Sequence, residues 1–375
     1  MSWFKIRTSN VLGGEVADTR IFGASWDGSS SSIWTRTDDA SLFVDPIPQY
    51  STGNGTWSTG SSPFDDIMPW AGMVVSEDSE AGTLVAIPKF YYKMGYASGT
   101  TGLKIQISPS QFEGSNVSPA HQDRGDGKGE RDVVYIGRYH CSNSGYKSTS
   151  GYAPTANLTR AEFRSGIHNL GSTIWQNDYA MIMTLWLLYL VEFADWNSQA
   201  KIGGGCSTSG SIMNVGYTDS MTYHTGTTAT SIGRTTYGGT QYRNIEGLWD
   251  NVLDWCDGVV FSSSTIYAAL NPNNYSDSTT NYTNVGTRPT SSNYISKFTI
   301  STANGFDWFM YPSAVSGGEA TYISDYCYYY SSGVVLFVGG DYGQGQGYGL
   351  FFLFGYGAAS FKSAGIGSRL QKLPY

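Results

Sequence analysis

The sequence predicts an α+β fold in which many short strands flank two helices. Charged residues make up only 14% of the 375 residues and glycines number 47, a composition typical of loop-rich proteins with much β structure. Helical periodicity is confined to residues 159–194, and β-prone segments lie on both sides of that region. Strands, then two helices, then many strands and loops are the order typical of an α+β fold.

The segments before the helices alternate β-prone runs with Gly, Ser and Asp turns. We expect one or two strands over residues 82–96, where Pro88 marks a sheet edge or a bulge, because proline cannot donate to a β-ladder. Residues 112–131 read as a polar loop, and residues 132–142 as a further strand.

Two helices are the clearest local signals in the chain. Thr159 and Glu162 form a capping box at the head of a helix over about 160–169, which Gly171 is expected to end. The second helix, over about 178–194, is capped by Asn177 or Asp178. It is apolar nearly all round, which predicts burial, and it is too short and too acidic to span a membrane.

From residue 203 to the end, short strands separated by polar loops are predicted, with no further helix and no repeat of fixed period. The strand signals include residues 247–261 and 334–338. We divide the chain into a leader, residues 1–17, and one domain, residues 18–375.

Charge and cysteine usage exclude several classes of function. The net charge is −8 and no basic stripe is present, so no nucleic-acid partner is expected. The four cysteines are widely spaced and contain no C-x-x-C pair, which argues against a zinc or redox site and predicts reduced thiols. The N-terminal residues contain no apolar core of a signal peptide, so classical secretion is not indicated.

Several motifs suggest chemistry but favour a structural interpretation. Arg124-Gly125-Asp126 is an RGD tripeptide, yet a polar turn explains it better than integrin binding. The glycines at 343–349 alternate without a following lysine or helix, unlike a phosphate-binding loop.

Candidate metal and catalytic groups are equally unconvincing. Asp250, Asp254 and Asp257 supply hard oxygen ligands, but their spacing is not that of an EF-hand, and roles in turns are favoured. The four histidines show no metal-ligand spacing and accompany no nucleophile motif. We therefore expect no metal, no cofactor and no catalytic residue.

The C-terminal segment carries the strongest functional signal. Twelve tyrosines and phenylalanines lie between residues 326 and 361, separated by glycine and serine. A buried β-core explains residues 334–338 and the apolar side chains at 350, 351 and 353. It explains poorly Tyr342, Tyr348 and Tyr356, each beside a glycine, and the composition of this second set is that of antibody-like binding surfaces.

Residues 338–370 also resemble the C-terminal variable region of proteins diversified by diversity-generating retroelements. The resemblance lies in a set of frame residues, namely Gly339-Gly340, Gly349-Leu350-Phe351, Ala358-Ala359-Ser360 and Ile366-Gly367-Ser368-Arg369-Leu370. Tyr342 stands where the pattern has tryptophan, and Gly365 where it has asparagine.

The body of the chain adds to this resemblance. Residues 87–94, 135–154 and 190–205 are similar to a domain common in tail proteins of bacteriophages and prophages. Residues 247–258 look like a turn of C-type-lectin-like folds of the formylglycine-generating-enzyme type. The resemblance therefore implies a C-type-lectin-like fold with a variable region over about 325–365.

The implied function is non-enzymatic binding of a host cell-surface protein or glycan by a phage or prophage tail protein. Such a protein is made in the bacterial cytoplasm, is carried in the virion with other tail proteins, and is commonly a homotrimer. The implied ligand-binding residues are Tyr328, Tyr329, Tyr330, Asp341, Tyr342, Gln344, Gln346, Tyr348, Phe352, Phe354, Tyr356 and Phe361. Leu350, Phe351, Ile366 and Arg369 are expected to be buried frame residues.

Two alternatives remain open at this stage. The first is a cell-encoded variable ligand-binding protein outside any virion. The second is an oxidase of the formylglycine-generating type, which would need a redox-competent cysteine pair or a copper–thiolate site. Only Cys327 lies near the C-terminal tail, which disfavours the oxidase.

Overall fold

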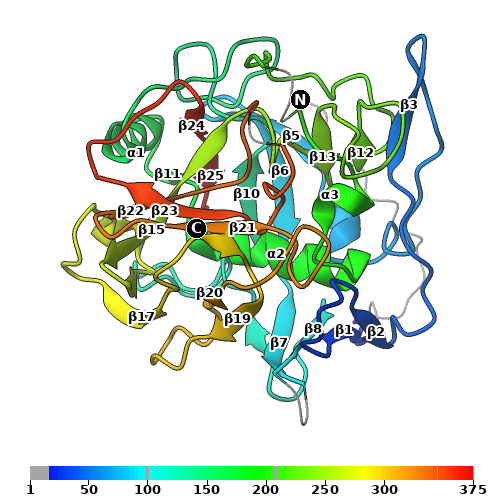
Figure 1. Cartoon of the computed structure of the whole chain (residues 1–375), viewed down its shortest axis with the longest axis horizontal. Helices are drawn as coiled ribbons and strands as arrows, with labels where there is room; N and C mark the ends of the chain where they lie inside the picture. The colour runs from blue at the N-terminus through cyan, green and yellow to red at the C-terminus, as the bar shows by residue number, and fades with distance from the viewer. Residues whose placement is uncertain (1–16, 98–100, 207–209, 344, 375) are drawn as a thin grey trace, which may run out of the picture.

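The computed structural model describes residues 17–97, 101–206, 210–343 and 345–374, without the side chain of Tyr356. The leader predicted for residues 1–17 therefore lies, apart from Ala17, outside the described residues. Within them the chain forms three α-helices, two short 3-10 helices and 25 strands. Figure 1 shows the second helix crossing the middle of the molecule with strands on several sides of it.

The fold is β-rich, with 33% strand and 10% helix. The predicted α+β class, and with it the C-type-lectin-like fold with two helices, is wrong. Both predicted helices exist, but they are short relative to the chain. The Asn-, Ser- and Gly-rich segments expected as loops contain many two- to five-residue strands, whose pairing is supplied by distant partners.

The N-terminal third contributes all of one five-stranded sheet and two strands of a second. The first has the order β2-β1-β8-β7-β9, with β1 (Phe22–Trp26), β2 (Thr35–Asp38), β7 (Tyr91–Tyr96), β8 (Leu103–Ser108) and β9 (Asn116–Val117). The second has the order β11-β25-β10-β6-β5, with β5 (Val75–Asp78), β6 (Gly82–Pro88), β10 (Val133–Gly137), β11 (Ile174–Gln176) and β25 (Leu370–Lys372). The last strand of the chain thus pairs between β11 and β10.

The remaining strands form three more sheets. One has the order β14-β13-β12-β3-β4, with β3 (Gln49–Gly53), β4 (Thr56–Trp57), β12 (Gly226–Thr227), β13 (Thr240–Tyr242) and β14 (Ile245–Glu246). The largest has the order β17-β16-β15-β22-β23-β21-β18, with β15 (Leu253–Ser262), β16 (Thr265–Ala268), β17 (Thr283–Thr287), β18 (Asn293–Tyr294), β21 (Tyr326–Tyr329), β22 (Val335–Val338) and β23 (Leu353–Gly357). β24 (Ile366–Ser368) pairs with β15, and β19 (Lys297–Ile300) pairs with β20 (Met310–Ala314).

Most strand predictions before the helices are confirmed. Residues 82–96 form two strands, β6 and β7, and residues 132–142 contain β10. The polar loop predicted over 112–131 contains only the two-residue strand β9. Pro88 does not mark an edge, because β6 lies between β5 and β10; it ends the strand, where its missing N–H does not interrupt the ladder.

The first helix, α1 (Arg160–His168), begins as predicted. The Thr159 hydroxyl accepts from the backbone N–H of Glu162, and the Glu162 carboxylate accepts from the backbone N–H of Thr159. Asn169 follows the last turn, and Gly171 comes two residues later. The capping-box prediction is confirmed.

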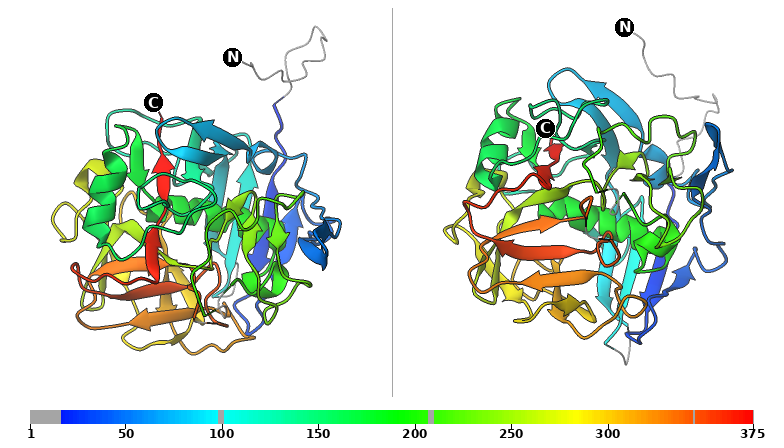
Figure 2. Two further views of the ribbon diagram at one scale, coloured as in Figure 1. Left: turned by 90° about the horizontal axis from the view of Figure 1, so that it is seen from above. Right: turned by 45° about the horizontal axis from the view of Figure 1, so that its top comes forward.

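The second helix, α2 (Tyr179–Phe193), is the centre of the core. All fifteen of its residues are buried, and Asp178, rather than Asn177, caps its first turn by accepting from the N–H of Met181. Figure 2 shows α2 running between the blue N-terminal strands and the orange and red C-terminal strands. A third helix, α3 (Ser198–Lys201), follows after four residues and was not predicted, because a single turn leaves no periodicity to detect.

Buried ion pairs hold both ends of α2. Asp178 pairs with the guanidinium of Arg124 and also accepts from Gln371 at 2.6 Å. Glu192, in the last turn, pairs with Arg243 and accepts from Tyr242 at 3.0 Å. These partners come from three different parts of the chain, so the helix is fixed to its surroundings by charge as well as by apolar packing.

The RGD tripeptide is not displayed as an integrin ligand would be. The Arg124 side chain is buried, and it donates to Asp178, to the Tyr275 hydroxyl and to the carbonyl of Leu270. Gly125 adopts a positive φ of 69°, as the polar-turn interpretation requires. The 3-10 helices η1 (Trp70–Gly72) and η2 (Pro272–Asn274) are the remaining helical elements of the described chain.

All four cysteines are free and buried, as the prediction of reduced thiols requires. No helix among the described residues combines the length and the apolarity needed to cross a membrane.

Replacing Trp186 or Leu187 by alanine should lower the free energy of unfolding by about 2–5 kcal/mol, because each leaves a cavity in the closed core around α2. Chemical denaturation measures the loss. Leu42→Ala is the control, because that leucine is 93% exposed and its truncation should cost less than about 0.5 kcal/mol. A loss below about 1 kcal/mol for both core variants would contradict the central position of α2.

Candidate functional site

The backbone of the variable region is held by side chains that lie before it in the sequence or at its very start. The Asp325 carboxylate accepts from the N–H groups of Gly349, at 3.0 Å, and Phe351, at 2.8 Å. The Ser198 hydroxyl accepts from the N–H of Leu350 at 2.9 Å, and the Trp186 indole donates to the carbonyl of the same leucine at 2.9 Å. None of these bonds depends on the identity of the side chain at 348 or 352.

A second clamp holds the turn between β21 and β22. Arg288 is buried, and its guanidinium donates to the carbonyls of Gly355 at 2.8 Å, Ser263 at 2.9 Å, Tyr330 at 3.1 Å and Gly333 at 3.3 Å. It also lies over the rings of Phe261 and Tyr329. Burial lowers the pKa of Arg288 to about 10, which still leaves it charged at neutral pH. Sequence reasoning missed this residue, because an isolated arginine in a polar segment carries no signal.

Strand alternation divides the side chains of β21, β22 and β23 between two faces of the sheet. Cys327, Leu336 and Leu353 face the larger core around α2. Phe337 faces a second, smaller core, and the half-buried rings of Tyr328 and Phe354 pack against that core. The candidate binding face is the rim of this smaller core.

A hollow of about 160 Å³ opens at that rim. Four predicted binding residues line it, namely Asp341, Tyr348, Phe354 and Phe361. The frame residue Ile366, the buried Leu253 and Phe337, and Ser363 form the rest of its wall. The structure therefore brings residues 341, 348, 354 and 361 together around one concave site, although they span 21 positions of sequence.

Ring contacts extend this hollow into a continuous aromatic cluster. Tyr328 contacts Tyr348, Phe352 and Phe354, with centroid separations of 6.1, 5.9 and 4.6 Å. The Tyr348 hydroxyl donates to the Tyr328 hydroxyl at 2.8 Å, and burial raises the pKa of Tyr348 well above its usual value. Tyr326, which was not among the predicted residues, packs its ring against Tyr328 in a tilted arrangement, with 4.5 Å between the ring centroids. The run of tyrosines at 326–330 was the available signal for it.

The predicted binding residues differ in how much of each reaches solvent. Tyr330 is 47% exposed. Seven are half-buried, namely Tyr328, Tyr329, Asp341, Tyr342, Gln346, Phe354 and Phe361. Gln344 and the side chain of Tyr356 lie outside the described residues.

The expectation that Tyr348 and Phe352 are exposed is wrong. Tyr348 is 5% exposed and Phe352 is fully buried. Their rings stack on each other at 4.2 Å and lie inside the smaller core. Glycine on both sides of Tyr348 suggested an exposed binding residue, but the hydrogen bonds to residues 349–351 hold this segment against the core, so the rings of Tyr348 and Phe352 pack beneath the binding face.

The predicted frame residues are confirmed as buried. Leu350, Phe351, Ile366 and Arg369 are each at most 5% exposed. Arg369 donates to the carbonyls of Gly137 at 2.8 Å and Glu246 at 2.7 Å, and so joins β24 and β25 to the centre of the molecule.

Two glycines of the region are fixed by packing. A Cβ at Gly349 would lie 2.5 Å from a carboxylate oxygen of Asp325, and one at Gly355 would lie 2.0 Å from the guanidinium of Arg288. Gly345, in contrast, has no atom within 4 Å of such a Cβ. The two clamps therefore require glycine where they approach the backbone, whereas at position 345 glycine is favoured by the positive φ of 69° and not by packing.

The aspartates considered as calcium ligands are committed to other partners. Asp250 accepts from Thr240 at 2.7 Å, Asp254 from His140 at 2.9 Å, and Asp257 from Arg164 at 2.6 Å. In the parts of the chain that the structure describes, no group of three or more potential ligands is placed to hold a metal ion. The structural interpretation of these aspartates is supported.

Comparison with known proteins provides no independent assignment, because neither a protein-family model nor a curated protein matches the chain.

Tyr348→Ser should lower the free energy of unfolding by about 2–4 kcal/mol, because it empties part of the smaller core. Tyr330→Ser is the matched control: the same substitution at a ring that is 47% exposed should cost less than about 0.5 kcal/mol. Thermal melts of the two variants distinguish a ring that is part of the smaller core from a ring that lies at the surface. Equal losses of unfolding free energy in the two variants would contradict the assignment of Tyr348 to the core and of Tyr330 to the surface.

Asp325→Asn should change how stability depends on pH. Burial raises the pKa of the Asp325 carboxyl to about 7, so the folded chain holds this proton more tightly than the unfolded chain. The stability that the protonated Asp325 carboxyl adds to the folded state is fully present below about pH 4 and is lost as the pH rises to about 7. Asparagine does not titrate, so the variant should gain stability relative to the wild type across that window.

Urea denaturation of both proteins from pH 4 to pH 8 measures this difference. Glu246, whose pKa burial also raises to about 7, is present in both proteins, so its effect cancels. A difference independent of pH would contradict the assignment.

Proposed function

We propose that this chain is a retroelement-diversified receptor-binding protein of a phage or prophage tail, whose C-terminal face binds a molecule on the host-cell surface. The observation that carries the proposal is a separation of roles within residues 325–370. Side chains predicted to vary converge on one hollow, while Asp325, Ser198, Trp186 and Arg288 hold the backbone beneath them. Such an arrangement lets the face change without unfolding the chain.

The chemistry of the face suits a host-surface protein or glycan. Aromatic rings restricted by stacking provide contact area at low entropic cost, and tyrosine hydroxyls add polar contacts. Asp341 supplies a carboxylate at the edge of the hollow. With a net charge of −8, the protein is not suited to the phosphate backbone of a nucleic acid.

A binding role is favoured over oxidase chemistry by the state of the thiols. Burial raises the pKa of Cys327 to about 12, so this cysteine is protonated at neutral pH and is a poor metal ligand or nucleophile. It lies on the face of the sheet opposite the aromatic cluster. A cell-encoded variable binding protein remains the second candidate, because it would use the same face.

The remaining parts of the proposal follow from the tail assignment. The protein would be made in the bacterial cytoplasm, be carried in the virion, contact other tail proteins and act as a homotrimer. No cofactor is needed for this role.

The DNA beside the gene tests the retroelement. We expect a near-copy of the codons for about residues 325–365, differing almost only at adenines and lying next to a reverse-transcriptase gene. Sequencing the flanking region provides the measurement. A flank with neither feature would contradict diversification, whatever the ligand.

Binding to bacterial cells tests the face itself. Fluorescently labelled protein should bind strains related to the one that carries the gene, and Tyr328→Ser or Phe361→Ser should weaken binding by about 2 kcal/mol, roughly thirtyfold in Kd. Thr302→Ser, at an exposed position outside the cluster, is the control and should leave binding unchanged. Equal binding by all of these proteins would contradict the assigned face.

A further inference from the structure

A groove separate from the variable region lies beside α1. It consists of two hollows of about 350 and 230 Å³, which share His168, Trp175 and Asn273 and therefore adjoin. The C-terminal half of α1, strand β11 and the 3-10 helix η2 form its walls. No residue of the variable region lines it, and its volume is in the range of small-molecule sites.

A stacked aromatic pair forms part of the groove. The rings of His168 and Trp175 lie 3.9 Å apart, with only 21° between their planes. The Nδ1 of His168 donates to the carbonyl of Ile174 at 2.9 Å, which fixes the imidazole against the strand that carries the tryptophan. Both rings are half-buried, so the pair is held rigidly and still reaches the groove.

Residues that line the larger hollow carry polar groups without a partner among the described residues. They are the indole N–H of Trp175, the side-chain amide of Asn169, the hydroxyl of Ser165 and the Nη1 of Arg164. Asn169 and Ser165 are exposed, and each group lies on a residue lining the larger hollow. The groove therefore offers several hydrogen-bond donors and acceptors that the fold itself does not use.

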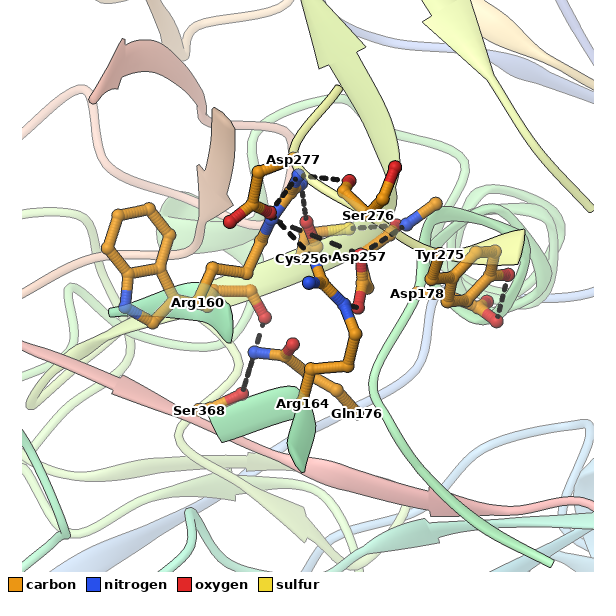
Figure 3. A network of polar contacts seen from close by, with 12 residues as sticks. Arg160, Arg164, Gln176, Asp178, Cys256, Asp257, Tyr275, Ser276, Asp277 and Ser368 are labelled. Carbon is orange, nitrogen blue, oxygen red and sulfur yellow. Dashed lines mark hydrogen bonds and ion pairs between the residues drawn. The ribbon is translucent and has the colours of Figure 1, made fainter. Parts of the chain in front are cut away.

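A network behind the groove holds Arg164 in place. Its Nε donates to Asp257 at 2.6 Å, and its Nη2 donates to Asp277 at 2.7 Å (Figure 3). Arg160 donates to the same oxygen of Asp277 at 2.8 Å. Two arginines thus face two aspartates, so the charge of Arg164 is offset. The smaller hollow is lined by one lysine, Lys128, and one aspartate, Asp126, so the groove has no excess of positive charge that would require an anionic ligand.

We propose that this groove binds a neutral saccharide, independently of the variable-region face. The C–H groups on the face of a sugar ring carry a slight positive charge and match the negative face of an aromatic ring. The hydroxyls of the sugar match the uncommitted amide, hydroxyl, indole and guanidinium groups. The groove thus combines an aromatic pair of fixed geometry with several polar groups, as a preformed ligand site does.

Saturation-transfer NMR with a panel of disaccharides tests the proposal on the full chain. The probes are cellobiose, maltose, lactose and N,N′-diacetylchitobiose. At least one should receive saturation from the protein. Ser165→Trp, which fills the groove from an exposed helical position, should weaken its binding at least tenfold. Thr302→Trp places the same side chain at an exposed position that does not line the groove, and should leave binding unchanged.

Two further variants keep the test decisive if Ser165→Trp folds poorly. Asn169→Ala removes an exposed amide and should weaken binding at least threefold with an unchanged melting temperature. Trp175→Phe removes the indole N–H while keeping a ring, and should weaken binding at least threefold in a chain that still unfolds cooperatively. Binding to none of the four disaccharides would overturn the proposal. So would binding that survives all three groove variants but is lost in Tyr328→Ser, which would place the sugar on the variable-region face.

Discussion

The complete burial of α2 is the constraint on which the rest of the structure depends. A helix that is apolar on every side must be covered on every side, and no single sheet can do this. Several small sheets, built from strands far apart in sequence, cover the helix instead. The two carboxylates at its ends, Asp178 and Glu192, are buried with their cationic partners, so the helix can take only one position among those sheets.

This rigid centre explains how the C-terminal region is supported. Trp186 of α2 and Ser198 of α3 bond to the backbone of Leu350, and Asp325 bonds to the residues on either side of it. Hydrogen bonds to backbone groups do not depend on which side chain a residue carries. Their effect is to place the backbone accurately while leaving neighbouring side chains free to differ, which is the physical requirement of a surface that must vary.

The same support limits how much can vary. The clamp on residues 349–351 draws Tyr348 and Phe352 under the face, where their removal should destabilise the fold. Tyr330 lies at the surface and the half-buried Phe361 lines the hollow, so substitutions at these two positions should weaken binding more than they lower stability. Folding and recognition thus depend on one aromatic cluster. The rings next to the clamp contribute mainly to stability, and the rings at the surface contribute mainly to binding.

The sequence by itself determined the local features: the capped helix α1, the buried helix α2, strands such as β22, and the aromatic C-terminal region as the site to examine. Capping and periodicity act over a few residues, so they can be read directly. Only the tertiary structure decided that the fold is β-rich, that Tyr348 and Phe352 are buried, and that Arg288 is a clamp. Short strands have little preference of their own, and burial of a ring or a guanidinium depends on which distant segments pack against it.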